Sequence, residues 1–204
     1  MYNLISKRVE LLNSSLISYS GLTVKAQLYN LNGKIIWEKS DKCDALSNTV
    51  SPMFEIVKPT GIYGAYFLKL TLFNKNVQLT DNIYWLTTKD KDYSQLEQLP
   101  ATKPKTSLQL NKEGGNYTGT LELAAFDNIS FFNRVKVFDK RTGKRILPVH
   151  YSDNYVTLMP GDKKIIKFEF SSSIDQQDVQ VFLDSWTSDR MEISVKMNRS
   201  LREP

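Results

Sequence analysis

The 204-residue chain contains one histidine, His150, and one cysteine, Cys43. A zinc site or a Ser-His-Asp triad needs several partner side chains at matched spacing, and the sequence around His150 does not supply them. Cys43 has no adjacent base to activate its thiol, and a single cysteine cannot form an intramolecular disulfide. The sequence has no glycine-rich phosphate-binding loop. We therefore expect no catalytic residues, no metal ligands and no cofactor.

A polar turn flanked by two tyrosines is the remaining candidate for binding chemistry. Such a stretch can contact a glycan or a neighbouring domain, because loops often carry function. The alternative, which we favour, is a structured turn whose polar side chains bond their own backbone. The candidate residues are Tyr151, Ser152, Asp153, Asn154 and Tyr155.

Three tryptophans each close an expected strand. A flat, exposed indole ring can stack on a sugar ring, whereas a buried one is a common core residue of β-sandwiches. Because large aromatic side chains strongly favour burial, we expect core positions for Trp37, Trp85 and Trp186.

The composition is that of a folded protein with a modest positive charge. Of all residues 41% are hydrophobic and 24% are charged, and the formal net charge is +5. The lysines and arginines are scattered beside expected turns, unlike the clustered charge of a nucleic-acid groove. The first fifteen residues lack the apolar segment of a signal peptide, and no apolar run has the length of a membrane span.

Alternating apolar and polar residues predict β-strands along the first half. Residues 22–29 and 66–73 show the clearest pattern, and residues 30–33 (NLNG) favour a hairpin turn because Asn and Gly tolerate positive φ. Residues 87–106 are polar, contain two prolines and have no period-two pattern, which indicates a linker with at most a helical turn. Further strands are expected at residues 8–12, 34–39, 50–57 and 77–86.

The second half repeats this organisation, with a strand at residues 131–138 that leads into a turn at Gly143. Short strands separated by frequent turn signals are typical of immunoglobulin-like folds. We predict an all-β chain of two tandem immunoglobulin-like antiparallel β-sandwiches, at residues 1–88 and 107–204, with a linker at 89–106. The other expected strands are 107–110, 116–124, 145–149, 155–158, 165–170, 179–186 and 191–197, and residues 199–204 are expected to fray.

Ordered motifs in the second half resemble the C-terminal β-sandwich of family 2 glycoside hydrolases of the exo-β-glucosaminidase and mannosylglycoprotein endo-β-mannosidase type. The motifs follow one another in the family's order, which makes the set more specific than any one of them. They are residues 137–139 (VFD), 142–149 (TGKRILPV), 151–155 (YSDNY) and 158–162 (LMPGD).

The first half is similar to the sandwich that follows the catalytic barrel in the same hydrolases. Residues 12–16 (LNSSL) and 21–34 carry this similarity, and residues 81–87 (DNIYWLT) resemble the domain's closing motif. Ile83 stands where the motif has an aromatic residue, and Thr87 where it has serine. The resemblance therefore covers nearly the whole chain.

The resemblance implies a non-catalytic accessory region of a glycoside hydrolase. In that family two glutamates on a (β/α)₈ barrel perform the hydrolysis, and such a barrel needs about 250 residues with alternating helices. This chain offers no counterpart to them, so it is expected not to be an enzyme itself. The parent would hydrolyse β-mannosides or β-glucosaminides in the periplasm or outside the cell.

The expected partners are the catalytic barrel of the parent and, in addition, glycans; neither nucleic acid nor a membrane span is expected. The alternative function is a free-standing carbohydrate-binding or adhesin-like module. An upstream barrel in the same gene would favour the accessory region.

Overall fold

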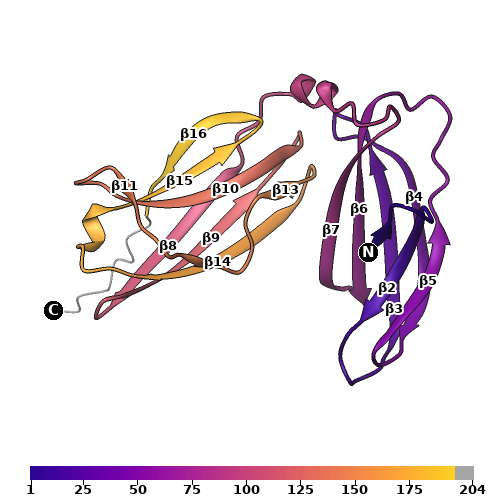
Figure 1. The fold of residues 1–204 in the computed structure, drawn as a ribbon, viewed down its shortest axis with the longest axis horizontal. Helices are drawn as coiled ribbons and strands as arrows, with labels where there is room; N and C mark the ends of the chain where they lie inside the picture. The colour runs from indigo at the N-terminus through magenta and orange to yellow at the C-terminus, as the bar shows by residue number, and fades with distance from the viewer. Residues whose placement is uncertain (196–204) are drawn as a thin grey trace. The chain divides into compact units, whose positions relative to one another are not determined.

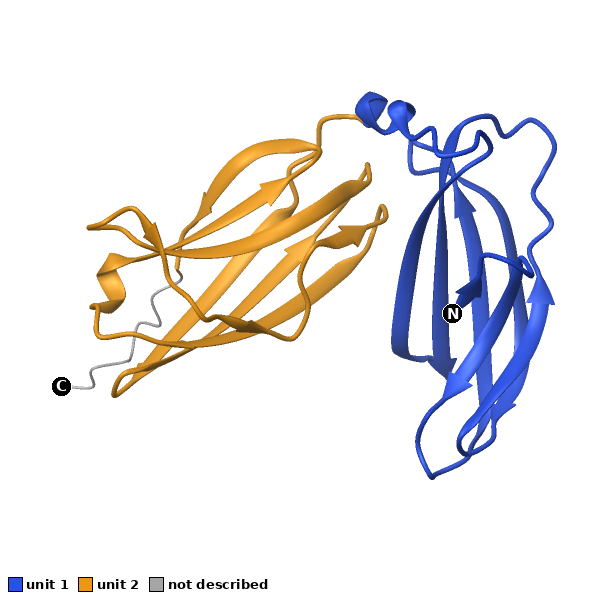
Figure 2. Cartoon of the chain, in the orientation of Figure 1, with its two compact units in different colours: residues 1–99 blue, residues 100–204 orange. Residues whose placement is uncertain are grey.

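The computed structural model describes residues 1–195, which form two compact units of β-structure (Figures 1 and 2). Unit 1 comprises Met1–Leu99, and unit 2 begins at Pro100. The strands within each sheet pair antiparallel. The predicted all-β fold with two tandem antiparallel sandwiches is confirmed. The end of the strand expected at 191–197 and the expected frayed residues 199–204 lie outside the described residues.

Unit 1 consists of a three-stranded sheet, in the order β1-β2-β5, and a four-stranded sheet, in the order β4-β3-β6-β7 (Figure 1). The apolar sides of both sheets meet in one core, whose members include Val24, Leu28 and Leu68. The strands are β1 (Tyr2–Asn3), β2 (Arg8–Asn13), β3 (Tyr19–Tyr29), β4 (Ile35–Ala45), β5 (Thr49–Glu55), β6 (Ala65–Asn74) and β7 (Val77–Thr87).

Unit 2 has the same two-layer construction, with sheets in the order β12-β14-β9-β8 and β11-β10-β15-β16; β13 also pairs with β10. The short 3₁₀ helix η2 (Gln176–Asp178) precedes β15. The strands are β8 (Lys105–Glu113), β9 (Asn116–Ala124), β10 (Ser130–Asp139), β11 (Lys144–Arg145), β12 (His150–Tyr151), β13 (Val156–Leu158), β14 (Lys163–Ser171), β15 (Val179–Ser185) and β16 (Ser188–Ile193).

The strand expected at residues 145–149 is not continuous. The structure instead contains the two-residue strands β11 and β12, which belong to different sheets. Pro148 lies between them, and proline cannot donate a hydrogen bond to a strand ladder. The chain therefore crosses from one layer of unit 2 to the other at this point.

The hairpin turns after β3 and β10 have the same construction. The Asn30 side-chain oxygen accepts the Asn32 N–H at 3.1 Å, and the Asp139 carboxylate accepts the Arg141 N–H at 2.9 Å. Gly33 and Gly143 follow at φ +74° and +65°, a conformation that glycine adopts without steric cost. The similarity of the two halves that the sequence indicates therefore extends to how these turns are stabilised.

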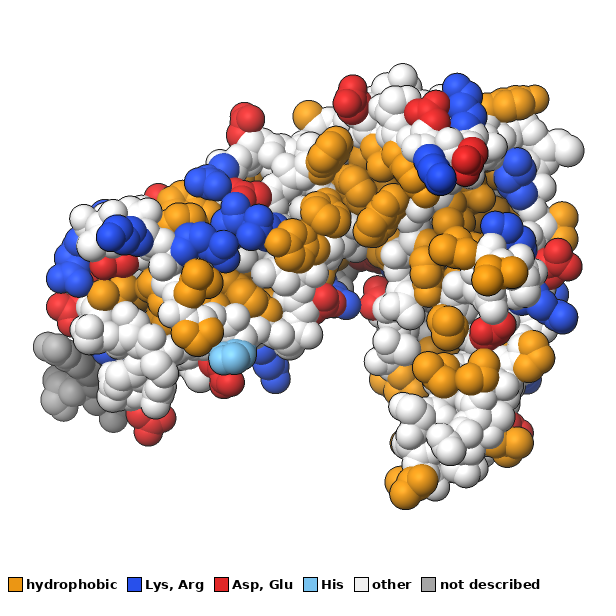
Figure 3. All heavy atoms as spheres, viewed as in Figure 1, with side chains coloured by type: hydrophobic (Ala, Val, Ile, Leu, Met, Phe, Trp, Pro, Cys, Tyr) orange, Lys and Arg blue, Asp and Glu red, His pale blue; other side chains and the backbone are white. Residues whose placement is uncertain are grey.

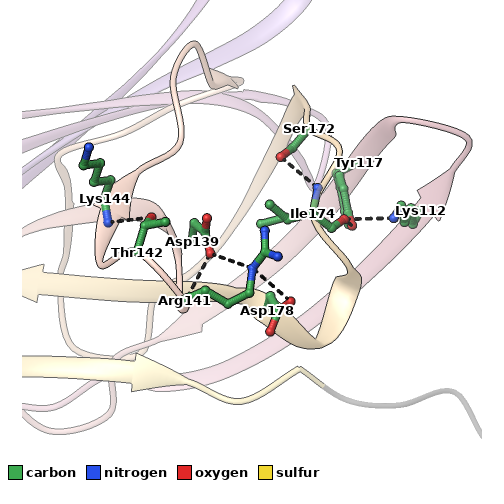
Figure 4. A network of polar contacts seen from close by, with 9 residues as sticks. All are labelled: Lys112, Tyr117, Asp139, Arg141, Thr142, Lys144, Ser172, Ile174 and Asp178. Carbon is green, nitrogen blue, oxygen red and sulfur yellow. Dashed lines mark hydrogen bonds and ion pairs between the residues drawn. The ribbon is translucent and has the colours of Figure 1, made fainter.

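The turn after β10 is also tied to the segment that precedes β15 (Figure 4). The Arg141 guanidinium lies 3.6 Å from the Asp139 carboxylate and 3.3 Å from that of Asp178. In the same view, the Tyr117 hydroxyl donates to the Ile174 carbonyl at 2.6 Å. These contacts hold together this end of unit 2.

The segment between β7 and β8 is not wholly extended. It contains the 3₁₀ helix η1 (Ser94–Gln98), whose Leu96 is buried. The Gln95 side-chain oxygen accepts the Ala65 N–H at 3.0 Å, at the start of β6. This part of the proposed linker 89–106 therefore packs on unit 1. Boundaries at 88 and 107 remain our proposal, which limited proteolysis between β7 and β8 would test.

Four aromatic rings pack against one another in the interior of unit 2. The centroids of Tyr117 and Phe170 are 4.7 Å apart and their rings are stacked. The Phe168 centroid lies 6.4 Å from that of Phe170 and 5.9 Å from that of Tyr151. Phe168 pairs in register with Gly119, and its ring occupies the space that a Cβ atom at Gly119 would need. Gly119 is therefore required for the close approach of this ring.

Gly119→Ala is expected to destabilise unit 2 by about 1–3 kcal/mol, the usual cost of overpacking a core. Phe168 is buried and contacts the rings of Tyr151 and Phe170, so moving its ring would disturb the packing of both. Urea denaturation of both proteins measures the difference. Gly115→Ala is the matched control, because the nearest atom to its Cβ, the Ser172 carbonyl oxygen, lies at an ordinary 3.9 Å. Equal stability of the two variants would contradict the prediction.

The outer side of the sheet that contains β15 carries a cluster of charges around Asp184. Its carboxylate accepts the Arg190 Nε–H at 2.6 Å and pairs with the Lys136 ammonium. The hydrogen bond from Arg190 lowers the pKa of Asp184, and Lys136 acts in the same direction. The Arg190 guanidinium also lies 5.5 Å from the Phe182 ring centroid. The folded state therefore favours the ionised carboxylate.

Asp184→Asn is expected to cost at most about 1 kcal/mol at neutral pH, since the cluster is partly exposed and screened by solvent. A carboxyl group whose pKa is lowered by folding stabilises the protein above its unfolded pKa, and that contribution is lost as the pH falls through the folded value. The stability difference between wild type and variant should therefore shrink below about pH 4. Thermal unfolding from pH 7 to pH 3 measures this, with Asp189→Asn as the exposed control. A difference that is independent of pH would disprove the assignment.

Candidate functional site

The loop of the five candidate residues lies in unit 2, where the chain leaves β12 and enters β13. β12 pairs with β14 in one sheet, whereas β13 pairs with β10 in the other. The loop therefore crosses from one layer of the sandwich to the other.

None of the helices in residues 1–195 has the length and apolar character that crossing a membrane requires.

Three polar side chains of this loop bind the backbone or a neighbouring charge. Asn154 accepts the Val135 N–H at 2.8 Å and donates to the Val135 carbonyl at 3.2 Å. The Ser152 hydroxyl accepts the Lys167 N–H at 2.9 Å. Asp153 accepts the Asn154 N–H at 2.8 Å, and its carboxylate lies 3.0 Å from the ammonium group of Lys164. These residues stabilise the turn.

The two tyrosines have different environments. The Tyr151 ring packs against the core, and its hydroxyl is buried without a hydrogen-bond partner among the described residues. Burial raises the pKa of Tyr151. Tyr155 is 44% exposed and has a φ of +59°, which is a strained conformation for an aromatic residue. Tyr155 is thus the tyrosine of this loop that can meet a partner.

Tyr155 is one of four neighbouring aromatic rings, a group that the sequence alone does not indicate. The ring centroids of Tyr155 and Phe132 are 5.1 Å apart, and those of Phe132 and Phe131 are 5.7 Å apart. The centroid of Trp186 lies 6.3 Å from that of Phe131. The Arg134 guanidinium lies 5.1 Å from the Tyr155 ring, within the range of a cation–π contact. We call the four rings the aromatic row.

A β-bulge in β10 places Phe132 in this row. The register between β10 and β13 shifts between Ser130 and Asn133, and Phe132 has a φ of +57°. Asn133 is fully buried and donates to the carbonyls of Ser130 and Val156, both at 3.0 Å, while accepting the Ser130 hydroxyl at 3.1 Å. The buried Asn133 side chain therefore stabilises the bulge. The alternation of apolar and polar residues in the sequence does not reveal this role.

The tryptophans only partly match the core positions expected for them. Trp37 packs against the core of unit 1. Trp85 is 40% exposed and Trp186 is 58% exposed. Trp186 lies in the tight turn between β15 and β16, where the chain reverses at the surface. The core expectation is therefore wrong for Trp85 and Trp186.

An open hollow of about 380 Å³ adjoins Tyr151 and Ser152. His150 and Glu169, which pair in register, lie at its edge. Glycoside hydrolysis uses two carboxyl groups, and among the described residues that line this hollow Glu169 is the one acid. Within residues 1–195, no group of three or more His, Cys, Asp or Glu side chains is placed to hold a metal ion.

Family models match both units. The model of the mannosidase Ig/CBM-like domain matches residues 8–89, and that of the exo-beta-D-glucosaminidase Ig-fold domain matches residues 82–188. The chain belongs to the exo-β-D-glucosaminidase Ig-fold family. The predicted resemblance to the C-terminal sandwiches of family 2 glycoside hydrolases is confirmed, and both units are immunoglobulin-like.

Curated relatives in the glucosaminidase family are much longer than this chain. The exo-beta-D-glucosaminidase of Hypocrea jecorina is 27% identical over 187 residues, which are 79% of this chain and 21% of the relative. That of Streptomyces avermitilis is 23% identical over 84% of this chain and 22% of the relative. The chain thus spans about a fifth of the length of these relatives.

The fold of these domains is also found in a solved exo-chitosanase, CsxA of Amycolatopsis orientalis. It superimposes with a TM-score of 0.83 at 22% identity, over 95% of this chain and 26% of that chain. At this identity the likeness shows that the two proteins share a fold, and it shows nothing about the ligands of this chain.

Proposed function

We propose that this chain is the non-catalytic, immunoglobulin-like accessory region of an exo-β-D-glucosaminidase and packs on its catalytic domain. The observation that carries the proposal is the match of a glucosaminidase Ig-fold model to residues 82–188, in a chain that spans about a fifth of its relatives. The relatives described above are named exo-beta-D-glucosaminidases, so we favour β-glucosaminides over β-mannosides as the parent's substrates. A periplasmic or extracellular location is part of the proposal.

The isolated chain is expected not to turn over an aryl β-D-glucosaminide, whereas the full-length product of the parent gene should hydrolyse it. The physical reason is that this all-β chain lacks the barrel that presents the paired carboxylates in such enzymes. Both proteins are assayed at equal molar concentration. Turnover by the highly purified isolated chain, lost on Glu169→Gln, would contradict the proposal.

A carbohydrate-binding module is the second candidate, and the exposure of Trp186 and Tyr155 in the aromatic row favours it. Exposed aromatic faces pack on the C–H faces of sugars. Under this function the Tyr151–Tyr155 loop meets a glycan; under the first it can equally meet a neighbouring domain. Binding of glucosamine oligosaccharides to the isolated chain, measured by tryptophan fluorescence and abolished in Trp186→Ala, would favour this candidate. Unchanged fluorescence at saturating sugar would remove it.

A further inference from the structure

One end of unit 1 presents aliphatic side chains to solvent from two adjacent loops and from the strand ends beside them. Residues 14–18 connect β2 to β3, and residues 46–48 connect β4 to β5. The last residues of β2 pair with the first residues of β5, so the loops lie at the same end of their sheet. The exposed side chains are Leu12, Leu16, Ile17, Leu46 and Val50, and we call them the aliphatic end.

The side chains of the aliphatic end are exposed to solvent. Leu16 is 90% exposed, Ile17 63% and Leu46 59%. In the space-filling view, the apolar side chains of unit 1 are interspersed with polar atoms (Figure 3). Several exposed apolar side chains gathered at one end of a domain can form an interaction surface.

A buried asparagine fixes the two loops. The Asn13 amide donates to the carbonyls of Ile17 at 2.8 Å, Leu46 at 3.0 Å and Ala45 at 3.2 Å. These three backbone carbonyls are thus paired, while the aliphatic side chains of the loops are exposed. Such a preorganised surface binds a partner at a lower cost in conformational entropy.

The scarcity of charge restricts the kind of partner. Residues 11–23 and 45–54 contain no charged side chain, although 24% of the whole chain is charged. The exposed Asp44 borders this end, and its carboxylate accepts the Gly21 N–H at 2.9 Å. Binding to anionic lipids or nucleic acid requires basic residues. Sugar platforms are built from aromatic rings, and within residues 11–23 and 45–54 Tyr19, 44% exposed, is the one exposed ring. Depletion of charge at an apolar centre is instead typical of protein–protein interfaces.

We propose that the aliphatic end is the surface that packs on the catalytic domain of the parent glucosaminidase. This inference rests on the proposed function, which supplies a larger protein body beside this chain. The chain matches 21% of the Hypocrea jecorina relative, so most of that enzyme lies outside the matched region. An apolar surface with few charges suits a permanent contact of this kind better than a transient one.

Cysteine labelling tests the inference. Leu16→Cys is introduced into a Cys43→Ser background, both in the 204-residue chain and in the full-length product of the parent gene, and the rate of maleimide reaction is measured. We expect rapid reaction in the isolated chain and a rate lower by about tenfold or more in the parent, because thiol reactivity follows exposure. Leu147→Cys, at an exposed site of unit 2, is the matched control and should react equally in both proteins.

The possible outcomes separate this inference from the proposed function. Equal labelling of Leu16→Cys in both proteins, in a parent that hydrolyses an aryl β-D-glucosaminide, overturns the inference and leaves the proposed function intact. A parent without this activity removes the proposed function, and with it the catalytic domain as partner. Protection that arises in the isolated chain as its concentration rises would identify a second copy as the partner, and this also overturns the inference.

Discussion

Leu68→Ala is expected to lower the melting temperature of unit 1 and to leave unit 2 largely unchanged. Leu68 has no exposed surface, and its register partners are Leu28 in β3 and Tyr84 in β7. Removing a buried leucine side chain costs about 2–5 kcal/mol, a large share of the roughly 5–15 kcal/mol that stabilises a domain. Differential scanning calorimetry of wild type and variant shows which transition moves.

Val137→Ala is the corresponding core substitution in unit 2. Val137 is buried in the middle of β10, with Val181 as its partner in β15. Fewer methyl groups are lost, so the expected cost is smaller than for Leu68, and it should fall on the other transition. Val77→Ala, at an exposed strand end, is the control for both. If Leu68→Ala and Val137→Ala shift one common transition equally, the two units do not fold separately and our two-domain proposal is withdrawn.

Asn133→Ala is expected to destabilise unit 2 by about 3 kcal/mol or more. The substitution leaves the buried carbonyls of Ser130 and Val156 and the Ser130 hydroxyl without the partner they have now. Each buried polar group left unpaired costs about 1–3 kcal/mol. Urea denaturation followed by circular dichroism measures the change.

The control for this prediction is an asparagine whose hydrogen bond is exposed. The Asn116 side chain accepts the Ser171 hydroxyl at 2.7 Å at the surface, where water replaces a lost partner. Asn116→Ala is therefore expected to cost well under 1 kcal/mol. A loss in Asn133→Ala no larger than that of Asn116→Ala would show that the bulge does not depend on Asn133.

Local sequence patterns were sufficient to predict most strands and the turns between them. The alternation of Leu22, Val24 and Leu28 with polar residues matches their burial in unit 1. Asn30 with Gly33 marks a turn through its own chemistry, because a side-chain oxygen and a positive φ are needed there. Features that depend on neighbouring residues along the chain were therefore predictable.

The aromatic row could not be predicted, because it depends on register between distant strands. Tyr155 was a candidate from its place beside a polar turn, but Phe132 joins it only through the shift between β10 and β13. Burial preference placed Trp186 in the core, whereas the turn after β15 keeps it at the surface. Likewise, Tyr151 looked equivalent to Tyr155 in the sequence, and only the fold turns it inward.

The crossing of the Tyr151–Tyr155 loop between the two layers has a consequence for cooperativity. On one side of the loop Ser152 is bonded to β14, and on the other side Asn154 is bonded to β10. Three consecutive residues thus fasten both sheets, so neither sheet can separate from this loop without straining its attachment to the other. Hydrogen exchange at the amides of Lys167 and Val135, which lie in different sheets, should therefore report one common opening event. The loop would then couple the two sheets of unit 2, so that the sheets open together when the unit unfolds.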